Sequence, residues 1–483
     1  MAIRSEESLE IEENFTHLIN GKLEGSESSF PVVNPSTESA FAKCPDASKE
    51  QLDEAVIAAR AAFNGWASCS YSERAEMLRR FGSTIAENME SLSELLTREQ
   101  GKPLVQAKSE IQRAAAQYDR ITRIEICPEV ITDDESQCIE LRYRPLGVVG
   151  AITPWNVPII LASGKIAQAL YTGNTMVLKP SPYTPLSTLR LGELAAEIFP
   201  AGVINILAGG DELGIWMTEH PDIDKISFTG SVTTGKKVMA SAASGLKRVT
   251  LELGGNDAAI VLGDVDPKKV APKLFAAAFV NSGQICAAIK RVYVHESLYE
   301  ELADAIVEEA EKVKFGDGLD PSSDYGPVNN KMQFEKLVDL IEDIKQSGAK
   351  ILTGGDVPDR AGYYINPTVV IDVDDDARVV KEEQFGPVLP ILKFSDLEEG
   401  IRRANDTRFG LSGSVWTNDL VKGEEIAARL QVGTARVNQH LGMSPDIPFG
   451  GAKESGLGRE YSIVGLKGYM EPEIVHINKD PIG

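Results

Sequence analysis

Cysteine is scarce in this chain of 483 residues, and its five copies are widely spaced. They lie at positions 44, 69, 127, 138 and 286, and none belongs to a CxxC pair. An odd number of scattered cysteines does not build a disulfide framework, and the missing CxxC pairs argue against a structural zinc site. We therefore predict a protein without a metal site that works in a reducing compartment, the cytoplasm.

Positive charge and long apolar runs are also in short supply. The chain has 49 Lys and Arg against 72 Asp and Glu, a formal net charge of −23. Binding to nucleic acid or to an anionic membrane needs clustered Lys and Arg, so we expect neither partner. No run of about 18 apolar residues occurs, and residues 1–18 are acidic without the apolar core of a signal peptide. We expect neither a membrane span nor a leader.

Hydrophobic residues, in contrast, make up 42% of the chain, enough for a large core shared by two or three domains. Apolar residues at helical spacing predict helices over 49–67 and 72–101. Short apolar runs rich in β-branched residues predict buried strands over 146–153, 175–180, 225–230, 258–264 and 290–295. Buried strands that alternate with helices indicate an α/β fold with doubly wound sheets.

Two further segments, 138–147 and 469–480, alternate apolar and polar residues as exposed antiparallel strands do. Edge strands of this kind expose unpaired backbone groups that favour pairing with another strand. We expect the two segments to pair with each other and to extend a sheet. This sheet would also continue across a subunit interface.

The stretch FTGSVTTGKK nearly matches a phosphate-binding loop. Gly230, Gly235 and Lys236 fit G-x-x-x-x-G-K, but Lys237 stands where Ser or Thr would ligate magnesium, so an ATPase or kinase is disfavoured. Gly230 and Ser231 at a helix N-terminus would still offer free N–H groups to a pyrophosphate, although a plain strand-to-helix turn is the default explanation if this stretch is taken alone. No G-x-G-x-x-G follows a predicted strand, so the usual dinucleotide fingerprint is missing.

Cys286 differs from the other cysteines in its setting. It lies in FVNSGQICAAIKR, residues 279–291, which is typical of an apolar helix. Near the start of such a helix, the dipole would lower the pKa of the thiol and make it reactive. The alternative is a buried cysteine that serves only as a small apolar side chain.

Two polar residues elsewhere are suitable partners for a reactive thiol. Asn156 follows a predicted strand in TPWNVP, where its amide would donate to an oxyanion or would merely form an Asx turn. Glu252 lies inside the apolar segment LELGGND, where burial would raise its pKa toward that of a general base. A salt bridge or an outward orientation would instead leave Glu252 an ordinary surface carboxylate.

Together these segments resemble the aldehyde dehydrogenase superfamily over nearly the whole chain. LELGGND and FVNSGQICAA match its two signature segments, and ITPWNVP, LKPSPYTP, FTGS, EEQFGPV and PFGGAKESGLGRE fall in its order and at its usual separations. The resemblance implies that Cys286 attacks an aldehyde, with the Asn156 amide and the Cys286 N–H as the oxyanion hole. Glu252 would activate water to hydrolyse the thioester without coenzyme A. Lys165 and Glu460 would support Glu252 and relay protons.

The resemblance also implies NAD as the cofactor. Lys179 would hold the adenosine ribose, and Glu383 and Phe385 would bind and back the nicotinamide ribose. Pro182 stands where many NAD-preferring members carry a Glu that repels a 2′-phosphate, so NADP would also be accepted. The full set implied at the cofactor comprises Ile152, Thr153, Pro154, Trp155, Lys179, Ser181, Pro182, Gly210, Phe228, Thr229, Gly230, Ser231, Leu253, Glu383 and Phe385.

The implied substrate tunnel is lined by Val157, Leu161, Gly164, Ile285, Met443 and Phe449. Gly164 stands where some relatives carry an aromatic residue, so we expect a roomy, mostly apolar tunnel without an Arg anchor. A medium-chain aliphatic or aromatic aldehyde then fits better than one bearing a carboxylate. Asp446 would favour a cationic amino-aldehyde instead, as in a betaine-aldehyde-like dehydrogenase.

The fold implied by the resemblance has two doubly wound Rossmann-like domains plus a small β oligomerisation arm. An NAD(P)-binding domain would comprise 1–125 and 146–253, a catalytic domain 254–462, and the arm 126–145 and 463–483. Arms of this kind form homodimers or homotetramers.

Two other functions compete with this one. A Cys–His hydrolase or acyltransferase would use Cys286 as nucleophile and His440 as base, but it leaves Glu252 and the Lys179 segment unexplained. Activity without a nicotinamide would favour it. A binding protein that kept the fold and lost catalysis is disfavoured, because Cys286, Glu252, Asn156 and Lys179 are all present.

Overall fold

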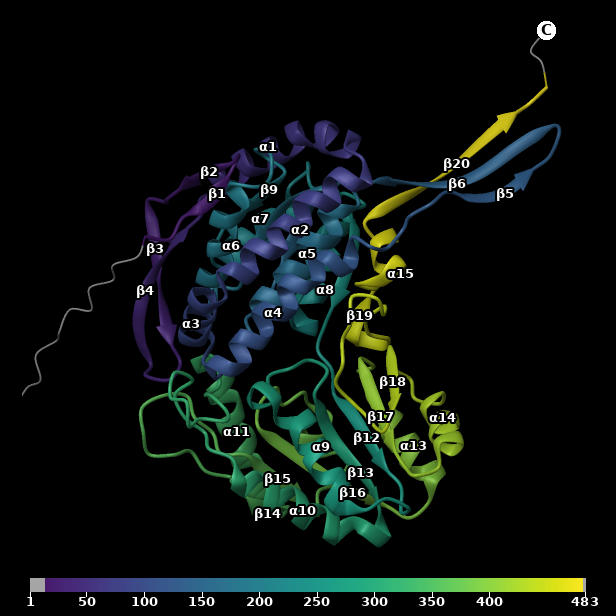
Figure 1. The fold of residues 1–483 in the computed structure, drawn as a ribbon. Helices are drawn as coiled ribbons and strands as arrows, with labels where there is room; N and C mark the ends of the chain where they lie inside the picture. Colours follow the sequence, from purple (N-terminus) through teal and green to yellow (C-terminus); the bar gives the residue numbers. More distant parts are fainter. Residues whose placement is uncertain (1–13, 481–483) are drawn as a thin grey trace, which may run out of the picture.

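The computed structural model describes residues 14–480, which form two large sheets flanked by helices and a smaller sheet that projects from the body (Figure 1). The predicted α/β class with doubly wound sheets is confirmed. The expectation of an acidic N-terminus without a leader, and the outermost ends of the predicted domain and arm, fall partly outside the described residues. Within 14–480, no helix is long and apolar enough to cross a membrane.

The first sheet has the strand order β19-β11-β10-β7-β8-β9-β1-β2. Its centre is parallel, and the chain visits β7, β8 and β9 before it returns to β10 on the other side of β7. The strand order therefore reverses between β7 and β10. The strands are β1 (His17–Ile19), β2 (Lys22–Glu24), β7 (Val148–Ile152), β8 (Thr175–Lys179), β9 (Ile204–Ile206), β10 (Lys225–Thr229), β11 (Arg248–Glu252) and β19 (Gly456–Leu457).

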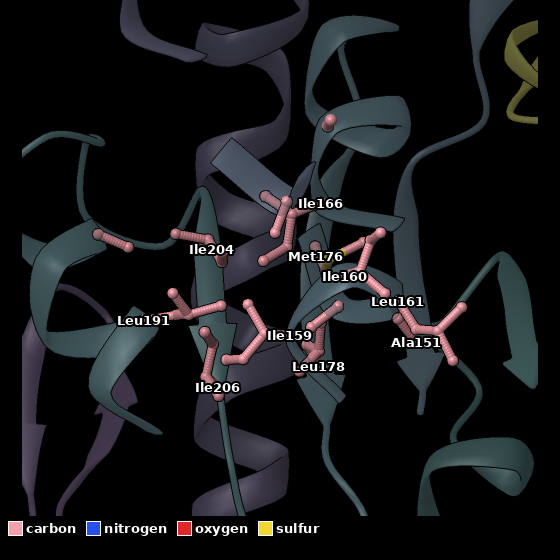
Figure 2. Packing of buried hydrophobic residues seen from close by; sticks show 14 of the residues in the cluster. Ala151, Ile159, Ile160, Leu161, Ile166, Met176, Leu178, Leu191, Ile204 and Ile206 are labelled. Carbon is pink, nitrogen blue, oxygen red and sulfur yellow. The ribbon is translucent and has the colours of Figure 1, made fainter. Parts of the chain in front are cut away.

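Both faces of this sheet are buried, because successive strand residues point to opposite sides. In β7, Ala151 joins the core under one set of helices and Val148 joins the core under the other. Figure 2 shows the first core, in which Ile159 and Leu161 pack against Met176 and Leu178. This core contains residues of α2 (Tyr71–Glu87), α3 (Met89–Gln100), α4 (Leu104–Ile121), α5 (Pro158–Tyr171) and α6 (Leu186–Ala196). The second core contains residues of α7 (Asp211–Glu219) and α8 (Val232–Ala243), and α1 (Lys49–Ser68) contributes to both.

The second sheet has the order β14-β15-β16-β13-β12-β17-β18 and is parallel apart from β14. It is built from β12 (Asp257–Val261), β13 (Ile289–His295), β14 (Lys350–Thr353), β15 (Thr368–Ile371), β16 (Val388–Phe394), β17 (Ser412–Trp416) and β18 (Thr434–Val437). Its helices are α9 (Pro267–Phe279), α10 (Tyr299–Lys312), α11 (Lys331–Ser347), α12 (Arg378–Lys381), α13 (Leu397–Asn405) and α14 (Leu420–Ala427). After β18 the chain returns to the first sheet, where β19 pairs with β11 and α15 (Ser462–Lys467) follows.

The third sheet is the projecting one in Figure 1, and it joins β5 (Glu129–Asp133), β6 (Gln137–Pro145) and β20 (Met470–Asn478). β20 pairs antiparallel with β6 from Met470 opposite Pro145 to Asn478 opposite Gln137. The predicted pairing of the two exposed strands is confirmed. A separate hairpin, β3 (Ser28–Asn34) with β4 (Ser39–Asp46), runs along the opposite side of the body in Figure 1.

Local sequence explains where several helices begin. Ser48 caps α1, since its hydroxyl accepts from the Gln51 N–H at 3.2 Å while the Gln51 side chain accepts from the Ser48 N–H at 3.1 Å. Ser70 and Glu73 form the same capping box at α2. The predicted helix over 49–67 is confirmed as α1, but the one over 72–101 is two helices, α2 and α3, that meet at Asn88.

The predicted helix over 279–291 is wrong. α9 ends at Phe279, and Val280–Gly283 form a single tight turn. Asn281 and Ser282 have φ of 51° and 56°, in the left-handed region where a right-handed helix cannot continue. β13 then begins at Ile289. Cys286 therefore lies in a loop between a turn and a strand.

Candidate active site

The loop that carries Cys286 is held by buried polar residues. The Asn281 amide donates to the Asn156 carbonyl at 3.0 Å, and the Gln284 amide donates to the Asn281 carbonyl at 2.9 Å. Lys290 Nζ donates to the Gly283 carbonyl at 2.6 Å. Cys286 as a residue is partly exposed, and no described group accepts from its backbone N–H. The loop therefore presents both a nucleophile and a backbone donor.

Asn156 lies directly beside this loop, as the sequence suggested. Its side-chain Nδ2 donates one N–H to the Gln284 carbonyl at 2.9 Å, and no described group accepts its second N–H. Its backbone carbonyl accepts from Lys102 Nζ at 2.9 Å, and Lys102 is paired with buried Glu110. Lys102 and Glu110 thus hold Asn156 in place, and neither was singled out by sequence reasoning because no local motif marks them.

Glu252 occupies the last position of β11 with 4% of its surface exposed. Neither of its carboxyl oxygens has a hydrogen-bond partner among the described residues. Removal from water, and secondarily the negative charge of Glu460, raise the pKa of Glu252 well above its usual range, while Lys165 and Arg459 oppose the shift. The predicted direction is confirmed, and a buried carboxyl with no internal partner remains available for proton transfer.

Lys165 and Glu460 form a fully buried ion pair, so the structure brings together two residues that the resemblance had linked. Lys165 Nζ also donates to the Ser227 hydroxyl at 2.9 Å, and Ser227 donates to Glu460 at 3.2 Å. The Tyr469 hydroxyl donates to Ser227 at 3.0 Å. Ser227 and Tyr469 extend the pair into a network that sequence reasoning missed.

The expectation of a lowered thiol pKa at Cys286 is wrong, because no helix begins there. Burial raises the pKa of the Cys286 thiol to about 12, and the carboxyl groups of Glu383, Asp257 and Glu252 act in the same direction. Lys290 opposes this shift. The thiol is therefore surrounded by negative charge and needs a proton acceptor to become a thiolate.

Lys290 is a further residue that sequence reasoning overlooked. It is 1% exposed, and its Nζ lies 5.4 Å from the centre of the Phe385 ring. Burial lowers the pKa of Lys290 to about 8, whereas Glu383, Asp257 and Cys286 raise it. A lysine within the apolar segment AAIKRVYV was the available indication, since an unpaired charge is costly in a buried strand.

These pKa shifts predict how activity depends on pH. Cys286 and Glu252 both hold their protons more tightly than usual, and both must lose them to act as nucleophile and base. We expect kcat/KM for an aldehyde to rise from about pH 6 to about pH 9, by up to about tenfold per unit for each such group. Initial rates over this range, with circular dichroism to verify folding, measure it. A rate that falls with pH would contradict the assignment.

The predicted cofactor residues gather at the carboxyl ends of β7, β8 and β10, where the strand order reverses. Ligands of doubly wound sheets bind at such a point. The Thr153 and Thr229 hydroxyls are buried there without a partner. Burial lowers the pKa of Lys179, at the end of β8, to about 8, and Asp211 and Asp46 oppose this. The strand ends also carry Ile152, Pro154, Ser181, Pro182, Phe228 and Leu253, and Gly210 precedes α7.

At the turn into α8, one expectation is wrong. The Gly230 N–H is not free for an anion, because it donates to the Glu252 carbonyl at 3.0 Å. Ser231 caps the helix, with its hydroxyl accepting from the Thr234 N–H at 3.1 Å. The turn therefore fixes the end of β11, next to Glu252.

Glu383 and Phe385 lie against the catalytic loop from the other sheet. Glu383 Oε1 accepts from the Gly255 N–H at 3.0 Å, and the Phe385 ring packs edge-on against Trp155, with centroids 5.2 Å apart. Trp155 therefore lies against Phe385, which precedes β16 of the second sheet. A Cβ at Gly255 would lie 2.6 Å from the Cys286 carbonyl oxygen, so glycine permits this close approach.

The predicted tunnel residues only partly match the expectation of a roomy tunnel. Val157, Leu161 and Phe449 pack in one apolar cluster with Cys286, whereas Met443 is 42% exposed and Ile285 is partly buried. Gly164 does not leave open space, because a Cβ there would lie 2.6 Å from the Tyr461 hydroxyl. Asp446 forms an ion pair with Arg120.

His440 does not approach Cys286. Its fully buried ring lies 2.8 Å from the Ser414 hydroxyl through Nδ1 and 3.6 Å from an Asp257 oxygen through Nε2. A Cys–His hydrolase therefore lacks its base. Within residues 14–480, no three His, Cys, Asp or Glu side chains are grouped as metal ligands would be.

The fold and site define a doubly wound α/β protein in which a cysteine, a side-chain amide and a buried carboxyl lie near the carboxyl end of a parallel sheet. The model of the aldehyde dehydrogenase family matches residues 23–475. The chain belongs to this family. It is 38% identical to the aldehyde dehydrogenase LUC3 of Fusarium sp over 467 residues, which cover 96% of this chain and 99% of that protein.

Solved structures agree with this. The NAD+ complex of an aldehyde dehydrogenase from Bacillus cereus superimposes with a TM-score of 0.95 at 38% identity, covering 97% of this chain and 98% of that one. A betaine aldehyde dehydrogenase from Staphylococcus aureus in complex with NAD+ gives a TM-score of 0.94 at 32% identity, covering 97% and 96%. The two relatives share the fold and bound NAD+.

Proposed function

We propose that the protein oxidises an aldehyde to a carboxylic acid with NAD, and that it hydrolyses its acyl intermediate with water rather than passing it to coenzyme A. The observation that carries this proposal is the convergence of Cys286, the unused N–H of Asn156 and the unpartnered carboxyl of Glu252. Asn156 donates to Gln284 in the loop that carries Cys286, and Glu252 is close enough for its charge to act on the Cys286 thiol. A structural role for Glu252 would call for a hydrogen-bond partner, which it lacks.

Each chemical step is assigned to a residue of the chain. Cys286 loses its proton to solvent water, and its Sγ forms a bond to the aldehyde carbon as the C=O π bond opens; the negative charge on the aldehyde oxygen is stabilised by Asn156 Nδ2 and the Cys286 N–H. NAD held beside this carbon by Glu383 and Phe385 would supply the hydride acceptor, and loss of the hydride would convert the adduct on Cys286 into a thioester. Glu252 then takes a proton from water, and the hydroxide attacks the thioester carbon, so that the acid leaves and the thiolate returns. Lys165 and Glu460 provide a buried route for the proton.

The residues present fit NAD. Lys179 and the unpartnered hydroxyls of Thr153 and Thr229 would hold the adenosine and phosphate parts, and Glu383 with Phe385 would hold the nicotinamide side. The relatives from Bacillus cereus and Staphylococcus aureus that bind NAD+ support this choice. Pro182 presents no carboxylate to a 2′-phosphate, so we propose that NADP is used as well, at lower efficiency.

For the substrate, we propose a medium-chain aliphatic or aromatic aldehyde. Val157, Leu161 and Phe449 supply apolar surface next to Cys286. A cationic amino-aldehyde is the second candidate, and the Staphylococcus aureus relative is named a betaine aldehyde dehydrogenase. The pairing of Asp446 with Arg120 weighs against it, because it neutralises the charge that would attract a cation.

We also propose the domain and assembly plan implied by the resemblance. The NAD(P)-binding domain is 1–125 and 146–253, the catalytic domain 254–462, and the arm 126–145 and 463–483. Strand β19 lies within the bounds of the catalytic domain but pairs with β11 of the first sheet. The projecting three-stranded sheet would join protomers into a homodimer or homotetramer. A thiol nucleophile suits a reducing compartment, and we propose the cytoplasm.

The test is NADH formation without coenzyme A. Purified protein is mixed with NAD, and separately with NADP, and with aliphatic, aromatic, carboxylated and amino-aldehydes. We expect a rise in NADH absorbance with aliphatic or aromatic aldehydes and a larger kcat/KM with NAD than with NADP. Activity only upon addition of coenzyme A would refute the hydrolytic assignment, and a preference for amino-aldehydes would favour the second candidate.

A further inference from the structure

Tyr461 has a backbone conformation that is rare for a residue with a side chain. Its φ of 64° and ψ of 169° fall in a region occupied almost only by glycine. Its N–H donates to Gln168 Oε1 at 2.7 Å, and the flanking residues Glu460 and Ser462 are bonded to Phe449 and Pro445. The neighbouring contacts therefore impose this conformation. Such strain often marks a functional position, and here it aims the tyrosine side chain.

The side chain of Tyr461 points toward α5 next to the thiol. It is 3% exposed and packs in the apolar cluster that includes Phe449 and Leu161, against which Cys286 lies. Its hydroxyl would lie 2.6 Å from a Cβ at Gly164, so only a glycine leaves room for it. Tyr461 therefore forms the wall at the position where the sequence suggested open space.

The hydroxyl of Tyr461 forms no hydrogen bond with any described residue. Gln117 Oε1 would lie 2.9 Å from the same Cβ at Gly164. It also has no hydrogen-bond partner, so it does not accept from the Tyr461 hydroxyl. A phenol O–H in an apolar wall is costly unless something accepts from it. Burial, followed by the negative charges of Glu460, Glu252 and Cys286, raises the pKa of the Tyr461 phenol, so the phenol keeps its proton and can donate; the charge of Arg113 opposes this shift.

We propose that Tyr461 is a specificity-determining residue whose hydroxyl donates a hydrogen bond to an oxygen acceptor in the tail of the aldehyde. The preferred substrates are then aldehydes that carry an ether, hydroxyl, carbonyl or carboxylate oxygen beyond the reacting carbon. The proposal rests on the function proposed above and narrows its substrate class. It reverses the expectation that the tunnel only selects apolar tails.

The test compares Tyr461→Phe with the wild type on matched substrates. The pairs are 4-methyl- and 4-methoxybenzaldehyde, and the longer 4-methyl- and 4-methoxycinnamaldehyde, so that two tunnel depths are sampled. We expect Tyr461→Phe to lower kcat/KM about fivefold to tenfold for at least one methoxy compound and less than about twofold for its methyl partner. The wild-type-to-variant ratio cancels differences in intrinsic aldehyde reactivity. Phe keeps the ring, so the melting temperature should change little.

Tyr118→Phe is the matched control, because Tyr118 is a fully buried tyrosine of α4 whose hydroxyl also lacks a partner. It should affect methyl and methoxy substrates equally. The charge of the acceptor is tested with 4-carboxybenzaldehyde and the variant Arg113→Gln. If this variant lowers kcat/KM for 4-carboxybenzaldehyde alone, the preferred aldehyde has an anionic tail. If kcat/KM is unchanged, the tail is neutral.

Two failures can be told apart. If the wild type forms no NADH from any aldehyde, the proposed function fails and this inference fails with it. If the wild type is active but Tyr461→Phe changes methyl and methoxy substrates equally, or changes neither in both pairs, the inference alone is overturned.

Discussion

Replacing Cys286 with Ala is expected to abolish aldehyde oxidation, lowering kcat/KM by at least about 10³-fold to 10⁴-fold. No bond to the aldehyde carbon can form without the thiol, and the other four cysteines cannot replace it. Cys44 is fully buried and its pKa is raised by burial, and the others lie outside the site. NADH formation measures the loss, and titration of intrinsic fluorescence with NAD shows whether the cofactor still binds.

Cys127→Ala is the matched control for this variant, because Cys127 is exposed. It should oxidise aldehydes at the wild-type rate. NAD should bind to Cys286→Ala with an unchanged Kd. The thiol takes part in the reaction, whereas the proposed NAD site is formed by the strand ends around Lys179. Steady-state turnover of Cys286→Ala near the wild-type rate would remove Cys286 from the mechanism.

Replacing Glu252 with Gln is expected to give a burst of NADH of about one per active site and then a slow rate, reduced by roughly 10²-fold to 10⁴-fold. Hydride transfer precedes hydrolysis, so the first turnover proceeds, but an amide cannot take the proton from water. Rapid mixing should resolve the burst, and mass spectrometry should find the acyl group on Cys286. Glu300→Gln, an exposed glutamate on α10, is the control and should turn over normally.

The same substitution has a second, independent readout. The pKa of Glu252 is higher in the folded protein than in the unfolded chain, so wild-type stability falls as the pH rises above the unfolded value of 4.5. Gln carries no charge at any pH. Glu252→Gln should therefore gain stability relative to the wild type as the pH rises, and equal pH dependence in thermal melts would mean that Glu252 is not buried as described.

Much of the fold follows from local patterns. The apolar runs at β7, β8, β10, β12 and β13 are typical of strands buried on both faces, and α1 begins at its capping serine. These patterns depend on residues within a few positions of each other, so the sequence predicts them. Where the prediction failed, at 279–291, the residues at positive φ are Asn281, Ser282 and Gly283, whose backbone is set by contacts with Asn156 and Gly386.

The sequence by itself determined the identity of the chemical groups: the thiol of Cys286, the amide of Asn156, the carboxyl of Glu252 and the lysine at the end of β8. It also determined the α/β class, because hydrophobic spacing is a local property. Tertiary structure alone decided what surrounds those groups. The direction of the Cys286 pKa shift, the support of Asn156 by Lys102 and Glu110, and the filling of the Gly164 position by Tyr461 all depend on segments distant in the chain. Burial and Coulomb interactions act through space, so no local pattern records them.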